Sequence, residues 1–188
     1  NDSYFVENAG DKAVEAANQG TDTVSSRLTY TLPANVENLT LTDTSAVNGT
    51  GNGLANVMTG NVANNQLSGL AGSDILSGGG GNDILMGGAG NNILTGGVGN
   101  DVFRFTAPGN TGTVTDYNVV NDTIQLENGV FNALTATGTL PAGQFRVGAQ
   151  ALDGNDHVIY NKTSGALIYD GNGNGAGAAV QIGTLNPG

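Results

Sequence analysis

The sequence has an uninterrupted nine-residue period between Gly51 and Arg104. Six consecutive units begin with glycine and share Asp or Asn at the sixth position and a large apolar residue at the eighth. The sixth positions are Asn56, Asn65, Asp74, Asp83, Asn92 and Asp101, and the eighth are Met58, Leu67, Leu76, Leu85, Leu94 and Phe103. A short period held this strictly means that one small structural unit stacks on copies of itself.

Each unit combines a turn with a short strand. In the unit from Gly78 to Met86, six glycine-rich residues precede the apolar run Ile84-Leu85-Met86. Glycine reaches positive φ angles at little steric cost, so the first six residues are predicted to turn and the last three to form a strand. Two units then make one coil of eighteen residues. The predicted fold class is all-β, with coils of short stacked strands at its centre.

Stacking of alternate units places acidic side chains against one another. Asp83 and Asp101 are one coil apart, and stacked strands are separated by about 4.8 Å. Two uncompensated carboxylates at that distance repel by about 3 to 4 kcal/mol at an effective dielectric constant of about 20. Calcium removes this repulsion, because it binds six to eight oxygens at about 2.3 to 2.6 Å. Turn carbonyls without a strand partner are expected to complete its shell.

The repeat resembles the RTX, or hemolysin-type, calcium-binding nonapeptide, whose consensus is G-G-x-G-x-D-x-U-x with U a large apolar residue. The units Gly78–Met86 and Gly96–Arg104 match every specified position. The unit that begins at Gly69 has Leu70 at its second position, and a later unit has Asn92 at its sixth. The two earliest units have Asn at the second position and lack glycine at the fourth. The resemblance implies a parallel β-roll that binds several calcium ions.

Carried over residue by residue, the resemblance implies two sites in the roll. The stronger site would combine backbone carbonyls with two carboxylates, from Gly79, Gly81, Asp83, Gly96, Val98 and Asp101. The second would combine Leu70, Gly72, Asp74, Gly87, Ala89 and Asn92. It offers one carboxylate instead of two and is expected to bind calcium more weakly. Whether further ions bind between Asn65 and Asp83, or between Asn56 and Asp74, is left open.

Two flanking regions complete the predicted organisation. Residues 1–50 contain short alternating runs typical of strands, and we expect them to form a β-rich coil beside the roll at 51–104. Gly20-Thr21-Asp22-Thr23-Val24 repeats the tail of the nonapeptide. Asn1-Asp2-Ser3-Tyr4 repeats the same tail without its front half, so we expect an upstream repeat array to precede Asn1.

After Phe103 the glycine period stops, and residues 105–188 carry an ordinary apolar core. This region resembles the β-sandwich-like cap that closes the roll in secreted metalloproteases. Terminal repeats need such a cap to cover their last apolar layer. The resemblance implies that Asp116 and Asp122 close the last calcium site. The alternative is that both are ordinary turn-forming residues.

Composition narrows the classes of partner. The chain has 16 acidic and 5 basic residues and a net charge of −11, which disfavours binding to nucleic acid or to anionic membranes. It has no cysteine, which excludes disulfides and thiolate metal sites and suits a secreted protein stabilised by ions. No run approaches the roughly 20 apolar residues of a membrane-spanning helix.

Localisation is inferred from the resemblance. The sequence shows no N-terminal signal peptide. The family is exported through the type I secretion channel, directed by the C-terminal end, so the expected location is extracellular, either secreted or at the cell surface.

Catalytic motifs are not found. The single histidine is His157, and neither a His-Glu-x-x-His zinc motif nor a nucleophile elbow occurs. This segment is therefore not expected to be an enzyme, although an upstream part of the protein could be one.

The leading hypothesis is a calcium-binding module that folds outside the cell and serves as the C-terminal secretion and folding region of a larger protein. A narrow apolar column cannot offset the entropy of ordering so much glycine, so ion binding is expected to drive folding. Two alternatives concern structure: a flexible Gly/Asn linker, or a β-helix stabilised by asparagine stacks without metal. A third is a structural or adhesive cell-surface module that self-associates in a calcium-dependent surface layer or binds polysaccharide. Its predicted contact rows are Ile75 and Ile93 on one sheet and Ile84 and Val102 on the other.

Overall fold

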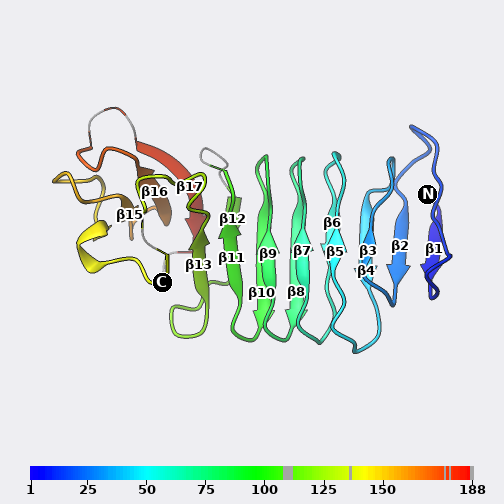
Figure 1. The fold of residues 1–188 in the computed structure, drawn as a ribbon. Coiled ribbons are helices and arrows are strands. Elements are labelled where there is room, and N and C mark those ends of the chain that lie inside the picture. Colours follow the sequence, from blue (N-terminus) through cyan, green and yellow to red (C-terminus); the bar gives the residue numbers. More distant parts are fainter. Residues whose placement is uncertain (108–111, 136, 176, 178, 187–188) are drawn as a thin grey trace.

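The computed structural model describes residues 1–107, 112–135, 137–175, 177 and 179–186. These residues form a β-solenoid with two stacked sheets and almost no helix (Figure 1). The predicted all-β class and parallel β-roll are confirmed. Among the described residues, the helical structure is a 3₁₀ turn, η1, at Ala142–Gln144.

The first sheet has eleven strands in the order β1-β2-β4-β6-β8-β10-β12-β17-β16-β15-β14. Its strands are β1 (Ser3–Val6), β2 (Thr23–Ser26), β4 (Asn38–Leu41), β6 (Val57–Thr59), β8 (Ile75–Gly80), β10 (Ile93–Val98), β12 (Gly112–Val114), β14 (Phe145–Val147), β15 (Val158–Tyr160), β16 (Ala166–Asp170) and β17 (Ala179–Leu185). The second sheet has six strands in the order β13-β11-β9-β7-β5-β3. Its strands are β3 (Tyr30–Thr31), β5 (Gly49–Thr50), β7 (Gln66–Ser68), β9 (Ile84–Met86), β11 (Val102–Phe105) and β13 (Thr123–Leu126).

The coil repeats every two nonapeptides, as the period predicted. Ile75 in β8 pairs with Ile93 in β10, and Ile84 in β9 pairs with Val102 in β11, so partners are eighteen residues apart. Successive units alternate between the two sheets because each ends in a strand and begins with a turn. The first sheet continues into the N-terminal coil, where β1, β2, β4 and β6 pair in parallel.

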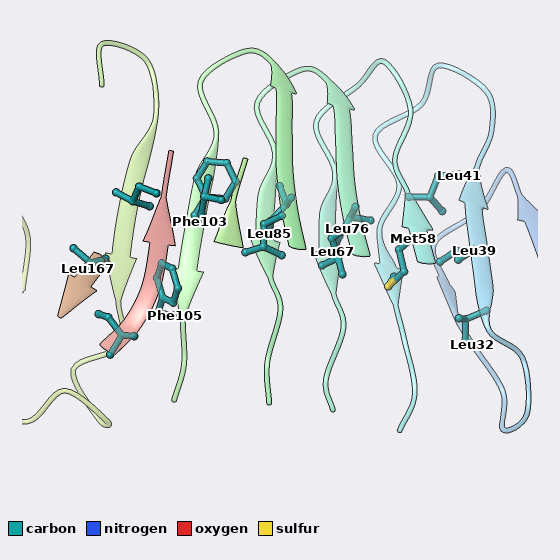
Figure 2. Close-up of a cluster of buried hydrophobic side chains, with 14 of the residues drawn as sticks. Leu32, Leu39, Leu41, Met58, Leu67, Leu76, Leu85, Phe103, Phe105 and Leu167 are labelled. Carbon is teal, nitrogen blue, oxygen red and sulfur yellow. The ribbon is translucent and has the colours of Figure 1, made fainter. Parts of the chain in front are cut away.

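The core is a single column of apolar side chains between the sheets, and Figure 2 shows part of it. Inward-facing residues of the nonapeptides are almost completely buried: Met58, Leu67, Leu76, Leu85, Leu94 and Phe103. Their neighbours in the same strands point outward, because successive side chains of a strand lie on opposite faces. Ile75 and Ile93 are accordingly 44% and 43% exposed, which confirms their predicted orientation.

The C-terminal strands extend the first sheet beyond the last nonapeptide. β17 pairs in parallel with β12, and β16 then pairs antiparallel with both β17 and β15. Phe131 and Tyr169 pack edge to face beneath these strands, with ring centroids 5.0 Å apart. The first sheet thus runs through all three predicted regions, and the division at residues 50 and 104 stays a prediction. No helix in the described part of the chain has the length and apolar character needed to cross a bilayer.

Candidate calcium sites

Two columns of polar side chains run along the solenoid, one beside each sheet. Each member directly precedes a strand, and the parallel register places members of one column on top of one another. The first column, beside the eleven-stranded sheet, contains Asp2, Asp22, Glu37, Asn56, Asp74 and Asn92. The second column, beside the six-stranded sheet, contains Asn65, Asp83, Asp101 and Asp122.

Hydrogen bonds fix the side chains within each column. In six of these steps the backbone N–H of one Asp or Asn donates to the side-chain oxygen Oδ1 of the next member. In the second column Asn65 donates to Asp83 at 2.7 Å, and Asp83 donates to Asp101 at 2.9 Å. In the first column Asp74 donates to Asn92 at 2.9 Å. The structure therefore brings together the Asp83–Asp101 pair and the Asp74–Asn92 pair on which the two predicted sites depend.

The second carboxylate oxygens of Asp74 and Asp83 lack protein partners. Oδ2 of each residue is buried and accepts no hydrogen bond from any residue that the structure describes. A buried carboxylate oxygen without a donor or a cation is strongly unfavourable, because it has lost its hydration without replacement. Such an atom marks a position where a cation fits.

Glycines at the start of the turns leave room beside these oxygens. A Cβ added to Gly78 would collide with Oδ2 of Asp83 and would lie 2.6 Å from the carbonyl oxygen of Gly96. At the equivalent place one nonapeptide earlier, on the other side of the coil, a Cβ on Gly69 would collide with Oδ2 of Asp74 and lie 2.7 Å from the carbonyl oxygen of Gly87. Each space is thus lined by a free carboxylate oxygen and a carbonyl oxygen from the next coil. An all-oxygen donor set of this kind suits calcium.

The electrostatic environment of these carboxylates also favours a bound cation. Burial raises the pKa of the Asp83 carboxyl to about 6, the N–H of Asn65 opposes the shift, and the charge of Asp101 adds to it. Burial likewise raises the pKa of Asp74 and of Asp101, and the charges of Asp122 and Asp116 raise the Asp101 value further. A raised carboxyl pKa means that the surroundings disfavour the negative charge. A divalent cation would reverse that preference.

Some turn carbonyls accept backbone hydrogen bonds that the sequence analysis did not predict. The prediction that they lack strand partners is wrong for three of the predicted ligands. The carbonyl of Leu70 accepts from Ala89 N at 2.7 Å, that of Ala89 accepts from Gly72 N at 3.0 Å, and that of Val98 accepts from Gly81 N at 2.9 Å. The cause is that parallel pairing extends into the turns on both sides of the coil. Gly79 lies opposite Gly97 where β8 and β10 continue, and Ala71 forms an isolated bridge with Ala89 after β7 and β9. Each carbonyl keeps a second lone pair, so a ligand role stays a prediction.

Asp116 and Asp122 lie at the end of the array, next to Asp101. Asp116 accepts from Gly96 N at 2.9 Å and from Gly97 N at 2.8 Å. Asp122 accepts from Asp101 N at 3.0 Å and from Asn118 N at 2.8 Å. Each carboxylate therefore holds two backbone donors, and Asp122 continues the second column. Their predicted role in closing a calcium site remains a prediction.

Not every buried carboxylate in the described residues lacks hydrogen-bond donors, and the comparison distinguishes the candidate ion sites from ordinary turns. Asp170 is completely buried, yet its oxygens accept hydrogen bonds from the backbone of Asn172, Gly173 and Gly175. That carboxylate is satisfied by its own turn. Asp22 resembles Asp74 and Asp83 instead, since its Oδ2 is buried and accepts no hydrogen bond from the described residues. The sequence analysis identified the nonapeptide-like tail around Asp22 but assigned no ligand there.

A family profile agrees with this geometry, and two further proteins are similar. The family profile described as the RTX calcium-binding nonapeptide repeat (4 copies) matches residues 50–85 and 77–105. A stretch of 41 residues is 51% identical to the endo-1,3-1,4-beta-glycanase ExsH of Rhizobium meliloti (strain 1021). That stretch covers 22% of this chain and only 9% of the glycanase.

A solved structure is also similar. It is the solution structure of the AlgE6R3 subunit from the Azotobacter vinelandii mannuronan C5-epimerase, with 24% sequence identity, 70% of each chain covered and a TM-score of 0.43. The identification depends on the profile match, whose span coincides with the glycine period and with the buried, unpartnered carboxylates. Residues 50–105 are therefore RTX nonapeptide repeats, and this part of the chain is a calcium-binding module.

Proposed function

We propose that the chain is a calcium-folded module of a larger secreted protein and has no catalytic role of its own. In this proposal the repeats stay unfolded at the low free calcium of the cytoplasm and fold after export. Type I secretion would deliver the protein outside the cell, with the C-terminal region directing export.

The observation that carries the proposal is the pair of buried oxygens, Oδ2 of Asp74 and Oδ2 of Asp83, which accept no hydrogen bond from the described residues and face carbonyls of the next coil. Without an ion these positions oppose folding, and with an ion they favour it. Metal-binding free energy then contributes directly to folding free energy. The net charge of −11 acts in the same direction, because bound calcium reduces the self-repulsion of the compact chain.

The proposed ligands follow the two polar columns. Calcium between Asp83 and Asp101 would use carbonyls of Gly79, Gly81, Gly96 and Val98. Calcium between Asp74 and Asn92 would use carbonyls of Leu70, Gly72, Gly87 and Ala89. Asp116 and Asp122 would close the array at its C-terminal end. Calcium supplies the positive charge that these buried oxygens lack.

Circular dichroism with buffered calcium tests the proposal. We expect the β-sheet signal to be largely lost with millimolar chelator and to return when calcium is added back, because the repeats lack a sufficient core of their own. Magnesium at the same concentration serves as the control, since its small octahedral shell suits such carbonyl-rich sites poorly. A β-sheet signal that survives complete calcium removal would contradict the proposal.

A second candidate function, calcium-dependent assembly at the cell surface, is favoured by one observation. Val57, Ile75 and Ile93 form a row across β6, β8 and β10, and each is more than 40% exposed. Apolar rows on an open sheet face are common at protein contacts. Light scattering during the same calcium titration separates the two candidates: a strict monomer at high protein concentration favours the secreted module, and growth in mass favours assembly.

A further inference from the structure

The N-terminal coil contains a third acidic cluster, outside the nonapeptide repeats. Asp2, Glu15 and Asp22 each place a carboxylate oxygen within 4.8 Å of the other two. Asp2 and Asp22 are successive members of the first column, directly before β1 and β2. Glu15 reaches them from the loop that joins those strands. Backbone segments distant in sequence thus converge on one point.

The cluster surrounds a carboxylate that the protein leaves unsatisfied. Asp22 is 1% exposed. Its Oδ1 accepts from Asp2 N and lies 3.4 Å from the ammonium group of Asn1. Its Oδ2 is buried and accepts no hydrogen bond from the residues that the structure describes. This is the arrangement found for Asp74 and Asp83 in the repeats.

The surrounding contacts hold the other carboxylates in place. The hydroxyl of Tyr4 donates to Oε2 of Glu15 at 2.7 Å. Glu37, the next member of the column, accepts from Asp22 N at 2.8 Å and adds another negative charge beside Asp22. The only positive group paired with Asp22 among the described residues is the ammonium group of Asn1, a residue whose side chain is 82% exposed. Three carboxylates with one buried free oxygen leave the cluster short of positive charge.

We propose that Asp2, Glu15 and Asp22 form a calcium site that is separate from the nonapeptide sites. Two oxygens bound to one calcium ion lie at most about 5 Å apart, twice the usual Ca–O distance, and the three carboxylates meet this limit. Hard oxygen ligands without nitrogen or sulfur select calcium over transition metals. Water completes the shell on the side of Asp2, which is exposed. The bound ion ties the loop after β1 to the first two strands.

The test counts calcium ions per full chain by equilibrium dialysis and elemental analysis, with isothermal titration calorimetry for affinity. Asp22→Asn keeps Oδ1 as the acceptor for Asp2 N but removes the charge. Glu15→Gln keeps an acceptor for the Tyr4 hydroxyl. Asp43→Asn is the matched control: it removes one charge from an exposed turn in the same region, at a positive φ that Asn tolerates. We expect Asp22→Asn and Glu15→Gln each to lose one ion, and Asp43→Asn to lose none.

If Asp22→Asn disturbs the fold, Glu15→Gln alone tests the N-terminal site, because Glu15 lies in a loop and belongs to no strand. An unchanged ion count in Glu15→Gln and in folded Asp22→Asn overturns the site, as does an equal loss in Asp43→Asn. Asp83→Asn separates this inference from the proposed function. If Asp83→Asn alone lowers the count, the N-terminal site is wrong and the repeat sites stand. If only the two N-terminal variants lower it, the N-terminal site stands and the repeat assignment fails.

Discussion

At the scale of single residues, Asn92 distinguishes the weaker of the two proposed calcium sites from the stronger one. It occupies the position at which the best-matching repeats have Asp, and its amide nitrogen donates to the carbonyls of Gly88 and Gly90 at 3.3 Å each. The amide thus ties together the turn of its own nonapeptide without an ion. Oδ2 of its partner Asp74 accepts no hydrogen bond from the described residues. The proposed site therefore combines an amide that protein groups satisfy with a carboxylate oxygen that calcium would satisfy.

Replacing Asn92 by Asp should have opposite effects at low and high calcium. At limiting calcium the variant loses two hydrogen bonds and sets a carboxylate against carbonyls, which should lower the free energy of unfolding by about 1 to 3 kcal/mol. At saturating calcium the added charge should tighten binding about tenfold, or about 1.4 kcal/mol. Urea unfolding at both calcium concentrations measures the two effects.

The exposed neighbour Asn91 supplies the control. Asn91→Asp adds the same charge outside the column and should change stability little at either calcium concentration. An effect of the same sign at low and high calcium in Asn92→Asp would contradict the assignment of this site.

At the scale of the element, β8 contains two glycines with different surroundings. Gly78 stands beside Oδ2 of Asp83 and the Gly96 carbonyl, so an added Cβ would occupy the proposed ion position. Gly80 lies two residues later, and the nearest atoms to its added Cβ are those of Val62 at 3.7 and 3.8 Å. Neither residue is among the positive-φ glycines, so backbone strain does not separate them. The strand needs Gly78 for space and not for conformation.

Gly78→Ala and Gly80→Ala therefore form a matched pair. We expect Gly78→Ala to weaken calcium binding by at least about tenfold, or 1.4 kcal/mol, because its methyl group displaces ligand oxygens. Gly80→Ala should bind calcium like the parent chain and gain about 0.4 to 1 kcal/mol of stability through a less flexible unfolded state. Calorimetric titration of both variants measures this, and equal affinities would exclude an ion beside Gly78.

At the scale of the whole molecule, stability should depend steeply on free calcium. The two sheets share one apolar column, so ions bound along it should stabilise the solenoid as a unit. Each ion that leaves on unfolding adds about 1.4 kcal/mol to the free energy of unfolding per tenfold increase in free calcium above its dissociation constant. Urea unfolding across buffered calcium concentrations gives the number of released ions from the slope. A slope of zero would show that the ions do not stabilise the folded state.

The central roll could be predicted from the sequence because the residues that determine it recur at a short, constant spacing. A constant spacing of eighteen residues per coil places Asp83 beside Asp101 and Asp74 beside Asn92. The same spacing assigns the buried side chain at every eighth position, from Met58 to Phe103. Steric freedom of glycine and alternation along a strand then predict the stacked coils and their columns of polar side chains, and the resemblance to RTX repeats identifies the coils as a β-roll.

The sequence indicated only part of the N-terminal extension of the first column, through the nonapeptide-like tails that contain Asp2 and Asp22. The stacking of the whole column could be found only in the tertiary structure. Its members are separated by 20 residues from Asp2 to Asp22, by 15 to Glu37 and by 19 to Asn56 before the interval of 18 begins. No single period aligns them, and Glu15 comes from a loop whose position depends on packing. Likewise, the C-terminal strands join the first sheet through the pairing of β12 with β17, which are more than sixty residues apart. Stacking of the coils can be predicted from the sequence where their spacing is regular. Irregular coils and pairs of distant strands depend instead on the free energy of the assembled sheet, which a local sequence pattern does not contain.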